Sequence, residues 1–472
     1  MKRRALLSLI PVVAPGIGAF IRTAAAQSES THREHSQESA WEKFGFGSKS
    51  LPGEPLALVY SRRIREMLTK VRETQSDKIL EAAHAIARTV EKGNRCWCCW
   101  DQGHTYRSDT FPGRIGEPEI LTPGYNAAQA RDGDLILADF PMSPADLEDI
   151  SKKDIFVVGG PSPWSGDPKN SEYILPEIRK NCVRPLADIW IDMDVDAIGA
   201  QVAIPGSPAP LGPESGPFSS SVMWMMLADA CRILAQDGKP VPVKGDEPKL
   251  TVKTPRVSLA EPLMDDYYEQ VMRQLEMVGM ELGDIRKMAG MVVDTLLAGG
   301  NVYFYSRYPE SLAYEATGRR GGYAFSKALS DGKIQGTSKD CVIMGTYQPE
   351  DEADLKNLDS MKKLGMKTAS IGPITRDTSI PGGRIVARET LVHIGRMTDT
   401  YGLFAIPGFD RKVCPTSGVL VTTLLWTMST EIARQIIDRT GGNTPAIYFN
   451  GALFWDKWWD AQVKTMMENR GY

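Results

Sequence analysis

A short polar loop after an apolar stretch holds the residue best suited to proton chemistry. Residues 101–106 read D-Q-G-H-T-Y, so that His104 follows Gly103 and is flanked by the further ligand candidates Asp101 and Thr105. An imidazole can change charge near neutral pH, and loops that leave the carboxyl edge of a parallel strand are where open α/β sheets bind ligands. A single loop histidine can also be a structural hydrogen-bonding group, and that alternative stays open.

A second stretch with chemical potential occurs twice at a constant offset. Residues 212–226 read G-P-E-S-G-P-F-S-S-S-V-M-W-M-M, and residues 414–428 read C-P-T-S-G-V-L-V-T-T-L-L-W-T-M. Each copy has the proline, hydroxyl and small residues of a helix start, followed by apolar residues at helical spacing. The N–H groups and hydroxyls there, at Ser215 and Ser417, suit an anion or a sugar hydroxyl. A capped buried helix would explain either copy alone, but two copies in register indicate a duplicated domain.

The elements that would position these residues also repeat. Apolar spacing predicts one long helix within residues 58–92 and another within residues 267–300, each followed by Gly-Asn and a buried strand. Further strands are predicted at residues 134–140, 155–158, 189–192, 341–346, 367–372 and 402–407. The order of strand, polar loop, helix and strand predicts an α/β fold with two tandem doubly wound parallel sheets.

Domain boundaries follow from this repeat and from changes in composition. The first domain is expected at residues 51–247, a Pro- and Lys-rich linker at 248–258, and the second domain at 259–472. The second domain ends in an aromatic tail that contains Trp455, Trp458 and Trp459. These tryptophans either pack on the body of the domain or form a stacking platform for a sugar ring.

The amino terminus predicts export. Residues 1–26 combine a basic start, an interrupted apolar stretch and three alanines as a cleavage site, and Arg3-Arg4 favours the twin-arginine type. Residues 27–50 are polar and are expected to be a mobile linker. Losing residues 1–26 removes four basic residues and no acid, which takes the formal net charge from -4 to -8. The mature protein is therefore expected in the periplasm or outside the cell, with no nucleic-acid partner and no membrane span.

The cysteines predict neither a disulfide framework nor a metal centre. Three of the seven lie together at residues 96–99, and the others stand alone, as buried thiols do. Asp192, Asp194 and Asp196 alternate and could hold a divalent cation, but a solvated strand end explains them as well. We expect no metal and no cofactor.

These features together resemble the sugar isomerase (SIS) family of phosphosugar-binding domains, over nearly all of the chain after the linker. The resemblance rests on a long helix that ends in Gly93-Asn94, on G-H-T at residues 103–105, and on G-P-E-S before the last helix of the first half. In the second half, S-R-Y-P-E-S-L-A-Y-E at residues 306–315 looks like the corresponding loop, with Glu315 where the family places an acid. The first half is most similar to bacterial SIS proteins related to phosphoheptose isomerase. Two SIS units in one chain are similar to the isomerase part of the fructose-6-phosphate aminotransferase, which implies flavodoxin-like domains that form a pseudo-dimer.

The loop after the second strand departs from the family. Members that bind a phosphate usually have a Ser/Thr-rich loop there, whereas this chain has D-F-P-M-S-P and G-T-Y-Q-P-E, with only Ser143 and Thr346 able to help. The acids Asp139, Glu350 and Asp351 would repel a phosphate. The ligand is therefore expected to be an unphosphorylated sugar or sugar derivative.

The resemblance implies an isomerase that works by proton transfer. Such an enzyme needs a base near the sugar C2 and an acid or proton shuttle near O1, and the candidates are His104 and Glu315, with Glu310 in addition. Substrate contacts are expected from Asp101, Gly103, Thr105, Ser143, Ser215, Ser306, Arg307, Thr346 and Ser417. The alternative is a non-catalytic carbohydrate-binding protein, and either form could be a homodimer.

Overall fold

The computed structural model describes much of the chain after the expected linker. The described residues are 48–100, 114–139, 142–160, 181–193, 195, 200–207, 210–243, 249–307, 312–317, 323–346, 348–374, 383–398 and 401–442. The export signal, most of the linker, the aromatic tail and the candidate residues Asp101, Gly103, His104, Thr105 and Glu310 lie outside them. Residues 45–472 form one compact unit, so the predicted boundaries between two domains stay a prediction.

Two five-stranded parallel sheets form the framework, and they have the same strand order. The first has the order β2-β1-β3-β4-β5 and the second the order β9-β8-β10-β11-β12. The first comprises β1 (Cys96–Cys99), β2 (Leu121–Pro123), β3 (Leu135–Ala138), β4 (Phe156–Gly159) and β5 (Ile189–Trp190). The second comprises β8 (Val302–Ser306), β9 (Ser326–Leu329), β10 (Cys341–Gly345), β11 (Lys367–Ile371) and β12 (Val392–Ile394). This flavodoxin-like order confirms the predicted fold class of two doubly wound sheets.

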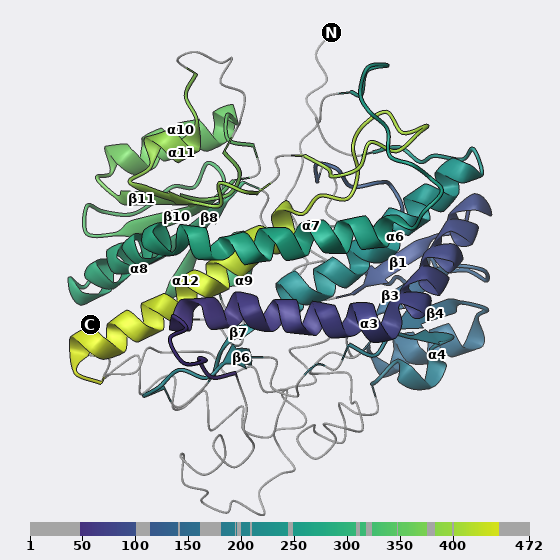
Figure 1. Ribbon diagram of the computed structural model, residues 1–472, viewed down its shortest axis with the longest axis horizontal. Coiled ribbons are helices and arrows are strands. Elements are labelled where there is room, and N and C mark those ends of the chain that lie inside the picture. The colour runs from purple at the N-terminus through teal and green to yellow at the C-terminus, as the bar shows by residue number, and fades with distance from the viewer. Residues whose placement is uncertain are drawn as a thin grey trace, which may run out of the picture. The chain divides into compact units, whose positions relative to one another are not determined.

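Long helices from the two halves pack against one another (Figure 1). The helix α3 contacts α6 of its own half and α12 of the other half, while α7 contacts α6 and α8 contacts α12. These helices are α3 (Leu56–Glu91), α6 (Ser220–Gln236), α7 (Leu263–Met277), α8 (Leu282–Leu297) and α12 (Ser417–Thr440). One large apolar cluster of described residues therefore runs through both halves, and each half has a smaller cluster of its own. Within the described ranges, none of the helices combines the length and apolarity that crossing a membrane would need.

Shorter elements complete the architecture. The helices are α4 (Pro144–Lys152), α9 (Leu312–Ala316), α10 (Glu352–Lys363) and α11 (Val386–Glu389), with helical turns η3 (Arg184–Leu186), η4 (Ser215–Ser219) and η5 (Val278–Glu281). A two-stranded antiparallel ribbon, β6 (Ala200–Val202) and β7 (Leu211–Pro213), leads into η4.

Two sequence predictions of individual elements were wrong. The second long helix is divided into α7 and α8 by η5, which contains Gly279, a residue that weakens a helix interior. The expected strand at residues 402–407 is also missing, because in that segment Phe404 makes only an isolated antiparallel bridge to Val413. The fifth strand of the second sheet is β12, which contains His393.

Matching hydrogen bonds fix the repeated helix openings. The Tyr60 hydroxyl on α3 donates to the carbonyl of Pro213 over 2.6 Å, and the Tyr267 hydroxyl on α7 donates to the carbonyl of Pro415 over 3.1 Å. All four residues belong to the stretches that repeat in the sequence. The same anchor in both halves supports the inference that one unit was duplicated.

The residue before each of these prolines has a left-handed backbone. Gly212 has φ +86°, and Cys414, at the corresponding place, has φ +61°. A Cβ at Gly212 would lie 2.7 Å from a ring carbon of Tyr60, so glycine is required there for space as well as conformation. Cys414 adopts a conformation uncommon for a non-glycine residue, and its N–H donates to the carbonyl of Gly116 in the first half.

Candidate functional site

The repeated helix openings begin where the sequence predicts, but without the predicted caps. The first turn of one copy begins at Ser215 and the helix of the other begins at Ser417. The cap residues are Glu214 and Thr416, and neither side chain accepts from the first helical N–H groups. The sequence-based expectation of hydroxyl capping was therefore wrong.

Each opening is instead covered by a charged side chain from the other half. In the first half, Arg114 is only 4% exposed, and its Nη2 donates to Ser417 Oγ over 2.9 Å. In the second half, the fully buried Glu315 accepts from Trp426 Nε1 over 2.9 Å. A Cβ at Gly216 would lie 2.7 Å from Glu315 Oε1, so the carboxylate lies directly against the first-half opening. Glu315 and Ser417 thus belong to the contact between the halves.

The crevice between β8 and β10, where the strand order reverses, is filled by α9. Ser306 ends β8 and Thr346 directly follows β10, and the two residues are only 2% and 1% exposed. The Ser306 hydroxyl accepts from the Ala313 N–H over 3.3 Å, and a Cβ at Gly345 would lie 2.5 Å from the Cβ of Leu312. The α9 helix therefore packs directly on the strand ends, and both hydroxyls remain predictions as ligand contacts.

The helix α4 of the first half, which corresponds to α10 of the second half, caps itself. Ser143 precedes α4, and its hydroxyl accepts from the Asp146 N–H over 3.1 Å and donates to the Asp146 carboxylate over 2.6 Å. Both functions of the hydroxyl are thereby used within one helix turn. Asp139, which the sequence placed in the same loop, is fully buried.

An open hollow lies at the carboxyl edge of the second sheet, beside the amino terminus of α10. It has a volume of about 420 Å³ and is lined by Arg307, Asp351, Glu352, Ala353 and Lys356. Arg307, from the end of β8, forms an ion pair with Asp351. Asp351 Oδ1 also accepts from the N–H groups of Ala353 and Asp354, over 2.9 and 3.0 Å. The place where a helix would bind an anion is thus held by the protein's own carboxylate.

A buried polar network lies beside this hollow. Asn357 donates to the Tyr305 hydroxyl over 2.9 Å, and that hydroxyl lies 3.1 Å from Asp354 Oδ1 and donates to it. Burial, and next the charge of Asp351, raises the pKa of Asp354 to about 7, against an ordinary value of 3.8. A carboxyl group that changes charge near neutral pH beside an open hollow is a candidate functional group.

Sequence reasoning found Arg307, which lines the hollow, but missed Tyr305, Asp354 and Asn357 of the network. One signal was present, because a tyrosine in a buried strand needs a hydrogen-bond partner for its hydroxyl. The partner itself could not be named from the sequence, since it lies 49 positions away.

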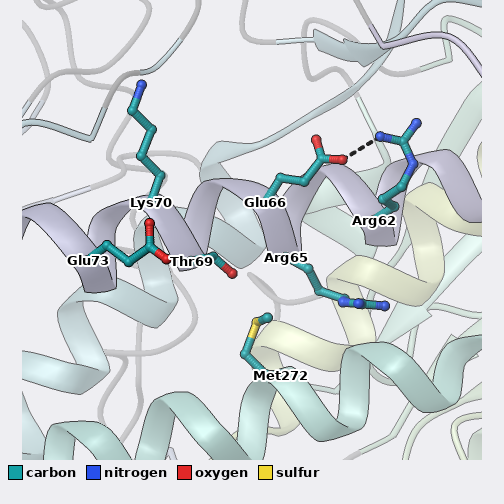
Figure 2. Close-up of a pocket in the computed structure, with 7 residues that line it drawn as sticks. All are labelled: Arg62, Arg65, Glu66, Thr69, Lys70, Glu73 and Met272. Carbon is teal, nitrogen blue, oxygen red and sulfur yellow. Dashed lines mark hydrogen bonds and ion pairs between the residues drawn. The ribbon is translucent and has the colours of Figure 1, made fainter.

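A second hollow, of about 430 Å³, lies between α3 and α7 (Figure 2). It is lined by Arg62, Arg65, Glu66, Thr69, Lys70, Glu73 and Met272. Arg62 donates to Glu66 over 2.6 Å, and Arg65 lies 3.4 Å from Glu276. Such paired charges are typical of a solvated helix face. In the part of the chain that the structure describes, no group of three or more His, Cys, Asp or Glu residues is placed to hold a metal ion.

Comparison with known proteins finds similar structures but no similar sequence. No protein family and no curated protein matches the sequence. The C-terminal domain of glucosamine-fructose-6-phosphate aminotransferase from Francisella tularensis is 12% identical, with a TM-score of 0.43 over 82% of this chain and 97% of that one. A provisionally named sugar binding protein from Salmonella typhimurium is 9% identical, with a TM-score of 0.42 over 79% of this chain and 98% of that one.

A provisionally named phosphosugar isomerase from Clostridium difficile is similar to the same degree. It is 8% identical, with a TM-score of 0.44 over 79% of this chain and 92% of that one. At these TM-scores and identities the likenesses carry no argument about function. The fold assignment rests on the strand order of the two sheets.

Proposed function

We propose that this protein binds a sugar or sugar derivative that has no phosphate group, in the hollow lined by Arg307, Asp351 and Lys356. The hollow lies where open α/β sheets place their ligands, at the carboxyl edge of the strands. Its guanidinium, ammonium and carboxylate groups can donate to and accept from neighbouring sugar hydroxyls.

The observation that carries this proposal is the position of the Asp351 carboxylate. This carboxylate accepts from N–H groups in the first turn of α10 and pairs with Arg307. A phosphate bound here would need the same N–H groups and the same guanidinium. A phosphate would have to displace this carboxylate and would be repelled by it. A neutral hydroxylated ligand has no such conflict.

Thermal-shift and calorimetric measurements against paired sugars and sugar phosphates test the proposal. We expect sugars to stabilise the protein, and the phosphorylated partners to do so less or not at all. Asp351→Ser should reverse this preference, since serine supplies a capping hydroxyl and removes the carboxylate that pairs with Arg307. Asp359→Ser is the matched control, because Asp359 lies on the same helix and pairs with Arg384 at the surface. Tighter binding of phosphates to the unaltered protein would refute the proposal.

A second candidate function is proton transfer between sugar carbons, with Glu315 as the base, as the family resemblance implies. The observation in its favour is a fully buried carboxylate at the contact between the halves, whose Oε1 accepts from the neutral donor Trp426. Deuterium incorporation at C2 of a bound sugar in D₂O would detect the reaction. Glu315→Gln should abolish that incorporation and retain binding, whereas unchanged incorporation would remove Glu315 from the reaction.

The proposal includes export, for which the support is the sequence of residues 1–26 alone. Cell fractionation of the full-length chain and of an Arg3→Lys, Arg4→Lys double variant tests it. Export by the twin-arginine route predicts that the unaltered chain leaves the cytoplasm and that the variant accumulates there. An unaltered chain that stays in the cytoplasm would contradict it.

A further inference from the structure

One chain of hydrogen bonds beneath the α10 hollow leads from Asn357 through Tyr305 to Asp354. The Asn357 side-chain amide donates to the Tyr305 oxygen, as well as to Asp331 and the Ala353 carbonyl, and the Tyr305 hydroxyl donates to Asp354 Oδ1. Burial, and next the nearby charge of Asp354, raises the pKa of Tyr305, so this hydroxyl keeps its proton. Asp354 is thus held by a neutral donor, while the neighbouring cation Arg307 is paired with Asp351.

Charged groups from three elements act on the Asp354 carboxyl. Asp351, the cap of α10, and Asp331, which follows β9, disfavour its ionisation, as does its own burial. Arg307, at the end of β8, and the hydrogen bond from Tyr305 favour ionisation. The acids and the burial prevail, since the pKa of Asp354 rises to about 7. The group therefore exchanges its proton in the physiological range.

The hollow itself is balanced in charge when Asp354 is protonated. Its lining includes two cations, Arg307 and Lys356, and two acids, Asp351 and Glu352. Asp351 is held by the N–H of Asp354, so the site of ionisation lies within the turn that forms the wall of the hollow. Loss of the Asp354 proton adds one negative charge beneath a site that is otherwise neutral.

Resting on the proposed function, we propose that Asp354 determines the charge of the preferred ligand, and that a sugar derivative with a protonated amine binds in this hollow with release of the Asp354 proton. The step is an acid dissociation: the carboxyl O–H bond breaks, the carboxylate keeps the electron pair, and the proton passes to the buffer. A positive charge in the hollow favours the ionised carboxylate by Coulomb attraction. Asp354 acts on the ligand from beneath the hollow, through the electrostatic field of its carboxylate.

Because ligand binding is coupled to loss of the Asp354 proton, the proposal predicts in which direction the ligand affinity changes with pH. A cationic ligand that lowers the pKa of Asp354 must bind more tightly as pH rises towards 7, by up to about tenfold per pH unit below pH 7. The gain in affinity ends above the pKa of Asp354 in the unliganded protein, because the proton is already lost there. An uncharged sugar should show little dependence on pH in the same range.

The experiment compares glucose with 6-amino-6-deoxyglucose, whose aliphatic amine stays charged between about pH 5.5 and 8. Calorimetry in two buffers with different protonation enthalpies measures affinity and proton release together. We expect the aminated sugar to gain affinity with pH and to release up to one proton below pH 7, while glucose does neither. Carbon-detected NMR of the aspartate carboxyls, without ligand, should show Asp354 titrating between about pH 6 and 8.

Three variants separate this role from a structural one. Asp354→Asn should bind the aminated sugar without pH dependence, and Tyr305→Phe, which removes a bond that favours ionisation, should move the pH midpoint upward. Asp359→Asn, on the same helix, should leave the profile unchanged.

The possible outcomes distinguish the two proposals. If glucose binds and the aminated sugar binds without pH dependence, this inference is overturned and the proposed function stands. If neither sugar binds at any pH, the proposed function fails and the inference with it. An Asp354 carboxyl already ionised at pH 5.5 overturns the inference whatever the sugars do.

Discussion

Asp354→Asn tests whether the buried carboxyl costs the protein stability at neutral pH. In the unfolded chain this carboxyl titrates near its ordinary pKa of 3.8, and in the folded protein at about 7. Between these values the folded state keeps a proton that the unfolded state has lost. The free energy of unfolding therefore falls as pH rises from about 4 to 7, and the loss is constant above that range.

The magnitude follows from the difference between the two pKa values. Roughly three pKa units at about 1.4 kcal/mol each give a loss of about 4 kcal/mol at pH 8, and about 2 kcal/mol at pH 5. Asparagine has nearly the same shape, accepts from Tyr305 with its carbonyl oxygen, and does not titrate. The free energy of unfolding of the variant should therefore increase relative to that of the unaltered protein as pH rises.

Urea unfolding of both proteins at pH 5 and at pH 8 measures this gain. Other acids titrate in both chains, so their effects cancel in the difference between the two proteins. We expect the advantage of the asparagine variant to be larger at pH 8 than at pH 5 by about 2–3 kcal/mol. An equal difference at the two pH values would refute a pKa near neutrality for Asp354, and with it the electrostatic account of the hollow.

Two further pairs of variants test the contact between the halves and the duplication. Gly216→Ala should destabilise the protein by about 1–3 kcal/mol in thermal unfolding, because its Cβ would displace Glu315 from its bond to an indole. Gly283→Ala, a helix position with no atom within 4 Å of the added Cβ, should be neutral or slightly stabilising, and equal losses would contradict the contact. Tyr60→Phe and Tyr267→Phe should each cost about 1–3 kcal/mol in urea unfolding, because each leaves a buried proline carbonyl without its donor. A cost at only one of them would show that the two anchors are not equivalent.

Much of the fold could be predicted because strong periodic signals mark it. The buried central strands read as apolar runs, and the long helices have a regular apolar spacing, in both halves. The edge strands β2 and β9 were missed because they lack such a signal: β9 reads S-K-A-L, with only its last residue buried. Their place is set by pairing with β1 and β8, which is a long-range property.

The candidate site was less predictable, for a physical reason. The sequence identified Arg307 and the acid Asp351, because both follow predicted strands. It could not identify Asp354, which occupies a common position for an acid in the first turn of a helix. Its altered pKa comes from burial against Tyr305 and from the nearby Asp351, and both depend on the folded chain. The Ser306 hydroxyl, a predicted ligand contact, accepts from the backbone N–H of Ala313 on α9, and its contact with a ligand stays a prediction.

The duplicated halves have diverged at the helix that follows the second of the predicted strands in each. In the first half, the neutral hydroxyl of Ser143 caps α4 and is satisfied by that helix itself. In the second half, the carboxylate of Asp351 caps α10 and in addition holds Arg307 from another strand. An acid at this position does two things that a hydroxyl cannot: it places a negative charge at the N–H groups of the helix end, and it raises the pKa of Asp354 behind it. The second half therefore has an acid where the first half has a hydroxyl, at the cap of the helix. This one difference argues against phosphate binding in the hollow and also accounts for part of the raised pKa of Asp354.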